Sequence, residues 1–123
     1  MENAKRILVI DDDIGMADLL ADFCEEMGCE VRCVTDGREA LRAAIDFRPH
    51  LITLDLEMPF LDGFEVLRLL RAHPATNRTP VVVVSVIAED SDLTSETVCG
   101  KLAKPVRYAA FAEKIQAMLK PAV

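Results

Sequence analysis

The sequence predicts an α/β domain in which five parallel strands form one doubly wound sheet with helices on both faces. Two features of the chain lead to this fold class. Short apolar runs alternate with segments of helical periodicity, as they do in successive βα units. The run Val81–Val84 is entirely β-branched, which is typical of a central strand covered on both faces. With 123 residues the chain has the size of one domain, which we expect to span residues 1–123.

The first half of the chain contains three of the strands and two helices. The strands are the runs at residues 6–10, 30–34 and 51–54. Apolar residues at helical spacing predict the first helix, which Asp13 caps and Gly28 stops. Its expected inward residues are Met16, Leu19, Leu20, Phe23 and Met27. The segment 36–39, Asp-Gly-Arg-Glu, resembles a capping box and opens a second helix, which ends before Pro49.

The second half continues the pattern. A third helix is expected at about 63–72, before Pro74. Its expected inward residues are Phe64, Leu67 and Leu70. After the strand at 81–84, residues 90–98 are rich in Ser, Thr and Asp, so any fourth helix there is expected to be short. A fifth strand at 101–103 leads to a last helix. The expected inward residues of that helix are Phe111, Ile115 and Met118.

The composition excludes several classes of function. The net charge of −7 argues against nucleic acid as a direct partner, because phosphate contacts need a basic patch. No apolar stretch is long enough to span a membrane, and the early first strand leaves no room for a signal peptide. We therefore expect a cytoplasmic protein without membrane insertion, and Met1 and the short tail after Leu119 favour a complete chain. The four cysteines lack the spacing of zinc ligands and are expected to be free thiols.

Polar side chains follow the carboxyl ends of four of the predicted strands. Asp11 and Asp12 come after the first strand, Asp55 after the third, Ser85 after the fourth and Lys104 after the fifth. In open α/β sheets, ligands bind outside this edge, near the point where the strand order reverses. We therefore expect these five side chains to converge on one site.

The three aspartates of this site would repel one another. Two carboxylates about 4 Å apart cost roughly 4 kcal/mol at an effective dielectric of 20. Either one of the acids stays protonated or a cation lies between them, and Lys104 supplies only one positive charge. Oxygen ligands without histidine or cysteine suit Mg²⁺ or Mn²⁺ better than zinc. The residues therefore predict a divalent cation site.

The ordered set of motifs resembles one known family. The set comprises Asp11-Asp12, Asp55-Leu56-Glu57-Met58-Pro59, Asp62-Gly63, Ser85 and Lys104-Pro105. In this order, with 30 residues from Asp55 to Ser85, it resembles the receiver domain of two-component response regulators. The resemblance covers nearly the whole chain. It implies a flavodoxin-like sheet with strand order 2-1-3-4-5, and a cis peptide bond before Pro105.

The resemblance also implies roles for the site residues. Asp55 would be the phosphoacceptor, a carboxylate nucleophile that attacks a phosphohistidine. Asp11 and Asp12, together with Asp55 and the backbone carbonyl of Glu57, would hold Mg²⁺ or Mn²⁺. Lys104 and the Ser85 hydroxyl would contact phosphoryl oxygens. The partners would be a histidine kinase or phosphotransfer protein and a downstream protein target. The domain would catalyse only its own phosphorylation and dephosphorylation.

The chain departs from the family pattern at three places. Lys101 occupies the position where most receivers have an aromatic residue in the fifth strand. The residue after Ser85, which is usually small, is Val86, and its side chain could narrow access to the phosphoryl group. Lys104 follows Ser85 by only 19 positions, a few fewer than usual. We therefore hypothesise that the acceptor chemistry is intact and that the output face is unusual.

Two other functions stay open at this point. The chain could be a receiver fold used as a protein-interaction module with little or no phosphorylation. It could also be a phosphatase with an aspartate nucleophile, since Glu57 lies at the offset of the second acid in such enzymes. The simpler interpretation of Glu57 is a solvated side chain, although it could also reach Lys104. Asp13 is expected to be a helix cap rather than a ligand, and Asp62 a turn or cap residue rather than a catalytic one.

Overall fold

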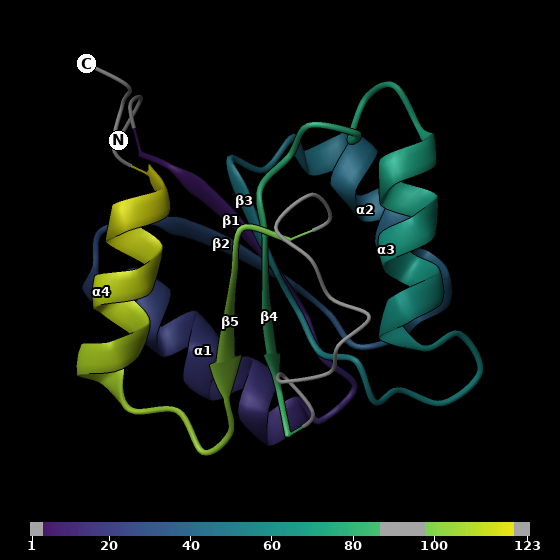
Figure 1. Ribbon diagram of the computed structural model, residues 1–123. Helices are drawn as coiled ribbons and strands as arrows, with labels where there is room; N and C mark the ends of the chain where they lie inside the picture. Colours follow the sequence, from purple (N-terminus) through teal and green to yellow (C-terminus); the bar gives the residue numbers. More distant parts are fainter. Residues whose placement is uncertain (1–3, 87–97, 120–123) are drawn as a thin grey trace.

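The computed structural model describes residues 4–86 and 98–119 of the chain and contains a five-stranded parallel sheet (Figure 1). The strands are β1 (Arg6–Ile10), β2 (Glu30–Val34), β3 (Leu51–Leu54), β4 (Val81–Ser85) and β5 (Gly100–Ala103). Their order across the sheet is β2-β1-β3-β4-β5, and every neighbouring pair is parallel. The predicted fold class and strand order are confirmed.

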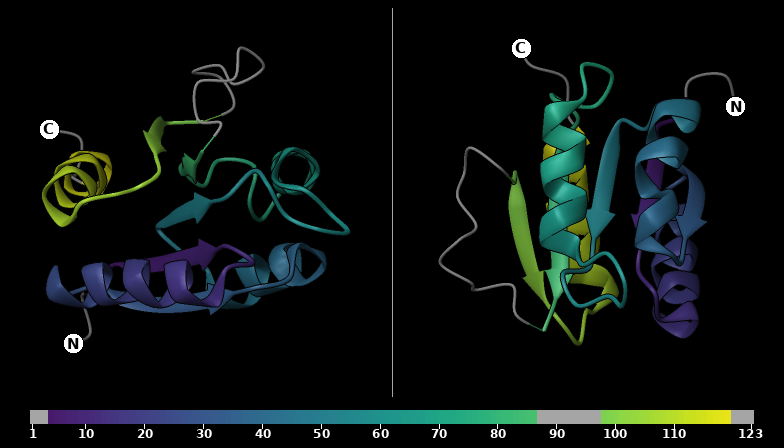
Figure 2. Two further views of the ribbon diagram at one scale, coloured as in Figure 1. Left: turned by 90° about the horizontal axis from the view of Figure 1, so that it is seen from below. Right: turned by 90° about the vertical axis from the view of Figure 1, so that its right-hand side faces the viewer.

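Four α-helices and one 3₁₀ turn surround the sheet in the described residues. The helices are α1 (Ile14–Glu26), α2 (Ala40–Phe47), α3 (Gly63–Ala72) and α4 (Tyr108–Leu119), and the turn is η1 (Gly37–Glu39). The helices α1 and α4 cover one face of the sheet, and α2 and α3 cover the other (Figure 2). The short helix expected at 90–98 lies outside the described residues, apart from its last position. None of the described helices has the length and apolar composition needed to cross a bilayer.

The three central strands separate two hydrophobic clusters. Leu8, Ile10 and Leu54 point to the side of α2 and α3, whereas Ile7 and Val9 point to the side of α1 and α4. Residues 81–85 of β4 are all buried, as the β-branched run predicted. Each fully buried side chain of this kind contributes about 1.5–3 kcal/mol. Burial on both faces therefore stabilises the central strands whose carboxyl ends carry the predicted site.

Helix α1 begins and ends where the sequence predicts. The Asp13 side chain accepts a hydrogen bond from the backbone N–H of Met16 at 3.1 Å, and Gly28 has a φ of 80°. The inward face was predicted less well, because Leu19 is 38% exposed. The buried residues of α1 are Ala17, Leu20 and Cys24, at spacings of three and four. The larger apolar residues beside this stripe lie at the rim of the core.

The other helices agree with the prediction except in detail. Asp36 caps the turn η1 through the N–H of Arg38 at 2.9 Å and makes no reciprocal capping box with Glu39. Helix α3 buries Val66 as well as Leu67 and Leu70, and its predicted inward residue Phe64 is only partly buried. In α4, Phe111 and Ile115 are buried and Met118 packs at the edge of the core. These differences leave the four helices of the described residues in their expected places.

Candidate functional site

Backbone hydrogen bonds between neighbouring strands place the candidate site at the carboxyl edge of the sheet. The N–H of Asp11 donates to Val34 in β2 at 3.0 Å, and the N–H of Asp55 donates to Ile10 in β1 at 2.9 Å. The N–H of Lys104 donates to the carbonyl of Ser85 at 3.3 Å. Asp11, Asp55 and Lys104 are therefore each tied to the neighbouring strand just beyond the end of their own strand.

Three carboxylates meet at this edge, as the sequence predicted. Oxygen atoms of Asp11, Asp12 and Asp55 all lie within 4.8 Å of one another. Asp11 is 1% exposed and Asp55 is 4% exposed, while Asp12 is half-buried. At such a separation each pair of charges repels by about 3.5 kcal/mol at an effective dielectric of 20. Burial and the charge of Asp11 raise the pKa of the Asp55 carboxyl above its ordinary value.

Lys104 is the cation that faces this cluster. Its Nζ atom lies 3.0 Å from Oδ2 of Asp11 and 3.6 Å from Oδ1 of Asp55. Burial disfavours the charged ammonium, but the hydrogen bond and charge of Asp11, together with Asp55, outweigh it and raise the pKa of Lys104. The ammonium therefore stays charged at neutral pH. One positive charge still leaves the three acids with an excess of negative charge.

Backbone hydrogen bonds orient the two buried carboxylates. Oδ1 of Asp11 accepts from the N–H of Asp13 at 3.0 Å, so its Oδ2 faces Lys104. Oδ1 of Asp55 accepts from the N–H of Glu57 at 3.3 Å. A hydrogen bond with the Ser85 side chain and the bond from Glu57 both favour the ionised form of Asp55, although neither cancels the effect of burial on its pKa. The Asp55 carboxylate, the Ser85 hydroxyl and the Lys104 ammonium thus lie close together in one site.

The donor set can hold a hard divalent cation. The side chains that meet are carboxylates, and no histidine or cysteine accompanies them within the group. Oxygen ligands of this kind suit Mg²⁺. The excess negative charge described above is also what a divalent ion would neutralise. Asp11, Asp12 and Asp55 therefore fit such an ion.

Glu57 and Pro105 complete the comparison with the sequence predictions. The Glu57 side chain is exposed, and the ion pairs of Lys104 within the described part of the chain are those with Asp11 and Asp55. The prediction that Glu57 is solvated is confirmed.

The peptide bond between Lys104 and Pro105 is cis, as the resemblance implied. Asp62 caps α3 by accepting from the N–H of Glu65 at 3.0 Å, and Asp13 caps α1, so both act as the caps that were expected.

Gly63 allows α3 to begin directly beside Asp55. Its N–H donates to the carbonyl of Leu56 at 3.0 Å. A Cβ atom at this position would overlap the carbonyl oxygen of Asp55 and would lie 2.5 Å from Cα of Leu56. Only a residue without a side chain fits this close approach. The loop from Asp55 to Gly63 is therefore held against the start of α3.

A stacked pair beside the site was not predicted from the sequence. Phe60 is 80% exposed, and the Arg38 guanidinium carbon lies 4.3 Å from the centroid of its ring. Phe60 has a φ of 67°, in the left-handed region that favours glycine. No pattern in the sequence signals this conformation, because the residue follows Pro59 in an ordinary turn-forming stretch. Only the structure shows that the loop presents an aromatic ring.

Two of the residues that depart from the family pattern, Lys101 in β5 and Val86 after β4, lie at the surface. The Lys101 side chain is exposed, so its ammonium is not forced into an apolar slot. Val86 is 63% exposed directly after Ser85. The hypothesis of an unusual output face is not tested by these positions, because residues 87–97 lie outside the described part of the chain.

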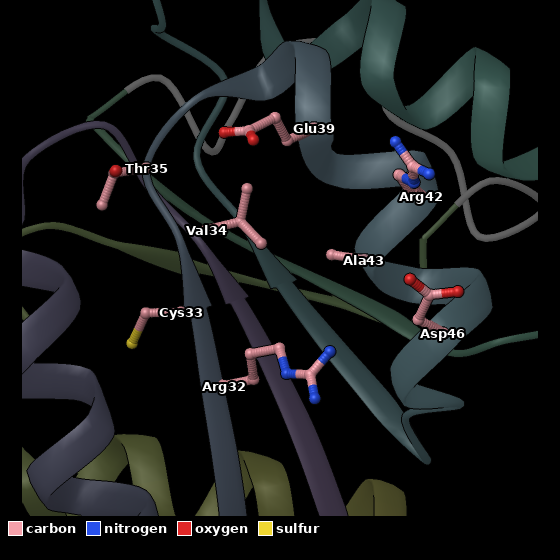
Figure 3. A pocket seen from close by; sticks show the side chains of 8 residues that line it. All are labelled: Arg32, Cys33, Val34, Thr35, Glu39, Arg42, Ala43 and Asp46. Atoms are coloured by element: carbon pink, nitrogen blue, oxygen red, sulfur yellow. The ribbon is translucent and has the colours of Figure 1, made fainter.

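A separate hollow of about 320 Å³ lies between the edge strand β2 and α2 (Figure 3). It is lined by Arg32, Cys33, Val34, Thr35, Glu39, Arg42, Ala43 and Asp46. In Figure 3, Arg32 and Val34 point toward α2, whereas Cys33 and Thr35 point away from it. None of the predicted site residues Asp11, Asp12, Asp55, Ser85 and Lys104 lines this hollow. It is therefore distinct from the acidic cluster.

Comparison with known proteins agrees with the fold and the acidic cluster. The family model of the response regulator receiver domain matches residues 7–116. The chain therefore belongs to the response regulator receiver domains of two-component signalling. Transcriptional regulatory protein PrrA of Mycobacterium tuberculosis is 37% identical over 118 residues, which cover 94% of this chain and 50% of PrrA. The chain thus spans about half the length of this relative.

Solved receiver structures are also similar. Chemotaxis response regulator CheY4 of Vibrio cholerae superposes with a TM-score of 0.88 at 26% identity, over 95% of this chain and 100% of CheY4. Response regulator TrrA of Thermotoga maritima, solved in complex with Mg²⁺-BeF, gives a TM-score of 0.84 at 29% identity. That match covers 94% of this chain and 99% of TrrA.

Proposed function

We propose that this receiver accepts a phosphoryl group on Asp55 and thereby switches its binding to a protein partner. The observation that carries the proposal is the buried Asp55 carboxylate, which shares one edge of the sheet with two further acids, a hydroxyl and an ammonium. Phosphoryl transfer needs positioning and charge neutralisation more than covalent help from the protein. This constellation offers both.

In the proposed reaction, an oxygen of the Asp55 carboxylate attacks the phosphorus atom of a phosphohistidine. The bond between phosphorus and the imidazole nitrogen breaks, an acyl phosphate forms on Asp55, and the imidazole nitrogen retains the electron pair. Lys104 is 3.6 Å from Oδ1 of Asp55 and would pair with a phosphoryl oxygen. The Ser85 hydroxyl would donate to another phosphoryl oxygen.

Asp11, Asp12, Asp55 and the backbone carbonyl of Glu57 would hold the divalent ion. When bound, Mg²⁺ would neutralise charge on the phosphoryl oxygens. The presence of Mg²⁺ in the TrrA complex supports this ion, and the oxygen donor set would also accept Mn²⁺. Without the ion, Lys104 is the one cation paired with the three carboxylates among the described residues, so phosphorylation should depend on added metal.

The partners follow from the reaction. We propose that the donor is a histidine kinase or phosphotransfer protein, and that residues 1–123 act as one receiver domain toward a downstream protein. The domain would catalyse only its own phosphorylation and dephosphorylation. The net charge of −7 disfavours direct binding of this domain to nucleic acid. The four cysteines are free thiols, which suits the reducing cytoplasm.

One observation keeps a second function in view. Lys101 is exposed in β5, where an apolar ring is usual in the family, so phosphorylation could be coupled weakly to output. The domain would then act mainly as a binding module. The phosphatase alternative is less well supported, since the Glu57 side chain points to solvent and forms no ion pair with Lys104 in the described part of the chain.

The test is incubation with Mg²⁺ and acetyl phosphate, read by intact mass. We expect the mass of one phosphoryl group on the wild type, no adduct in the presence of a chelator, and no adduct on Asp55→Asn. Asp46→Asn is a matched control, because Asp46 is an aspartate of α2 outside the acidic cluster. Absence of the adduct on the wild type would favour the binding module, and an equal adduct on Asp55→Asn would exclude Asp55 as the acceptor.

A further inference from the structure

Phe60 combines an unfavourable backbone conformation with an exposed ring. Its φ of 67° lies in the left-handed region, which is unfavourable for a residue with a side chain because Cβ approaches the following carbonyl oxygen. Burial of the ring could offset this cost, but the residue is 80% exposed. A glycine at this position would avoid the cost altogether. Strained backbone of this kind is characteristic of functional sites, which suggests that the exposed ring has a role.

The Phe60 ring makes a cation–π contact with Arg38, which is itself paired with Asp36. The guanidinium carbon of Arg38 lies 4.3 Å from the Phe60 centroid. Arg38 is held in turn by Asp36, whose Oδ2 atom is 2.7 Å from the arginine Nη2. Asp36 also accepts a hydrogen bond from the backbone N–H of Arg38 at 2.9 Å, so it contacts both the side chain and the backbone of this arginine. The stacking and the ion pair therefore favour one orientation of the exposed Phe60 ring.

The Phe60 loop is also packed firmly against the turn that carries Arg38. A Cβ atom at Gly37 would overlap the carbonyl oxygen of Leu61 and would lie 3.3 Å from the Met58 side chain. A small hollow of about 70 Å³ separates the loop from the first acidic residues. It is lined by Asp12, Thr35, Asp36, Gly37, Pro59 and Phe60. Phe60 thus stands at the rim of the acidic cluster.

Two other exposed apolar side chains lie at the same edge of the sheet. Ile14 is 66% exposed at the start of α1, two residues after Asp12, and Val86 is 63% exposed directly after Ser85. These two and Phe60, here called the apolar rim, are the most exposed large hydrophobic residues in the described part of the chain. Each of them follows the carboxyl end of a different central strand. The most exposed apolar side chains therefore lie at the edge of the sheet that carries the acidic cluster.

We infer that Phe60, braced by Arg38, is the anchor by which a protein that carries a phosphohistidine docks over Asp55. This inference rests on the proposed function. A small phosphodonor can reach Asp55 without touching the rim, whereas a protein donor must cross it. Interface hot spots are enriched in large, well-oriented side chains at the centre of a contact, and a preformed orientation lowers the entropy cost of binding.

Charge indicates what the donor presents beside its phosphohistidine. Asp12 and Asp13 are accessible at this edge, and the whole chain carries a net charge of −7. A donor with basic residues around its phosphohistidine would be steered to this edge, and an apolar side chain would cover Phe60. Arg38 remains 59% exposed and would meet a carboxylate on the donor. The donor surface is therefore apolar at its centre and mainly basic around it.

The test compares protein and small-molecule phosphodonors on Phe60→Gly. This variant should fold, because glycine adopts a positive φ without strain and the lost ring is mostly exposed. The protein probe is the autophosphorylated histidine kinase, among those of the organism that encodes the chain, that labels the wild type fastest. We expect its initial transfer rate to fall about tenfold or more in Phe60→Gly, as for an interface hot spot. Labelling by acetyl phosphate should not change.

Two controls separate docking from general surface effects. Leu69→Ser changes an exposed apolar residue of α3 and should leave both reactions as in the wild type. Phe60→Tyr keeps the ring and should transfer normally. Equal kinase-dependent rates in Phe60→Gly and the wild type would overturn the inference. The inference would also be overturned if acetyl phosphate labels the wild type but none of the kinases does.

Three further outcomes would each overturn the inference in a different way. If Phe60→Gly changes the sedimentation of the chain, the rim contacts a second copy and does not dock a donor. If Phe60→Gly lowers acetyl phosphate labelling as much as kinase labelling, Phe60 supports the site itself. If acetyl phosphate fails to label the wild type at all, the proposed function fails first, and the inference falls with it.

Discussion

Replacing Gly63 by alanine places a methyl group where the backbone of the Asp55 loop already lies. The new Cβ atom would overlap the carbonyl oxygen of Asp55 and would stand 2.5 Å from Cα of Leu56. Both obstructing atoms belong to the main chain, so no side-chain rotation relieves the overlap. Either α3 or the loop that carries Asp55 must move by about 1 Å to restore an ordinary contact, which is the situation of an overpacked core.

Overpacking typically costs about 1–3 kcal/mol, and the upper end applies here because the obstacle is backbone. A loss of about 3 kcal/mol corresponds to a fall in Tm of about 12 °C for a chain of this size. The shift of the loop also displaces the Asp55 carboxylate from its partners. We therefore expect Gly63→Ala to bind Mg²⁺ more weakly than the wild type, even at temperatures where it is folded.

Gly28→Ala is the matched control for this prediction. Gly28 has a φ of 80°, and a Cβ atom there would meet nothing within 4 Å. The control therefore measures backbone strain alone, which costs about 1 kcal/mol. Thermal unfolding and Mg²⁺ titration are measured on both variants. If Gly63→Ala is no less stable than Gly28→Ala, or binds Mg²⁺ as the wild type does, the steric argument is refuted.

Changes of charge give three more expected outcomes. Burial and Asp11 raise the pKa of Asp55, so its ionised form is destabilising once the pH rises through that pKa; Asp55→Asn should therefore melt above the wild type at pH 7 in a chelator, and a lower Tm would contradict this. Mg²⁺ at about ten times its Kd should stabilise the wild type by about 1.4 kcal/mol, and Asp55→Asn by less; equal gains would exclude Asp55 as a ligand. Burial and the charges of Arg6 and Lys5 lower the pKa of His50, whose Nδ1 accepts from the Arg6 N–H at 2.9 Å. The stability that neutral His50 contributes is therefore present above its pKa in the unfolded chain. This stability is lost as the pH falls through its pKa in the folded protein. His50→Gln should flatten the fall of the urea midpoint between about pH 7 and 5, and parallel curves would argue against this role.

The sequence was sufficient for those features that depend on chain-wide patterns. In a chain of alternating elements, an apolar run such as Val81–Val84 indicates a central strand covered on both faces. Once the strands are parallel, their carboxyl ends share an edge, and the meeting of Asp11, Asp55 and Lys104 follows. Caps such as Asp13 were predictable because their chemistry is local.

Features that depend on tertiary packing or on single backbone angles were not predictable. In α1, two adjacent stripes satisfy the helical period, and small residues such as Ala17 and Cys24 give a weak hydrophobic signal although they form the buried one. The large Leu19 was therefore predicted to face inward and is partly exposed. The left-handed conformation of Phe60 has no sequence signal, because an aromatic residue rarely adopts it. Its stacking on Arg38 joins two loops whose proximity only the folded chain reveals.

The position of Lys104 has a consequence for the order in which the domain is built during synthesis. Asp11 and Asp55 come from the adjacent strands β1 and β3, whereas their counter-ion follows β5 at the end of the sheet. A nascent chain that has released only its first three strands holds the mutually repelling acids without the ammonium. Addition of the last strand is then favoured by charge as well as by burial. Lys104 therefore neutralises part of the charge of the acidic cluster and also favours the addition of β5 to the sheet.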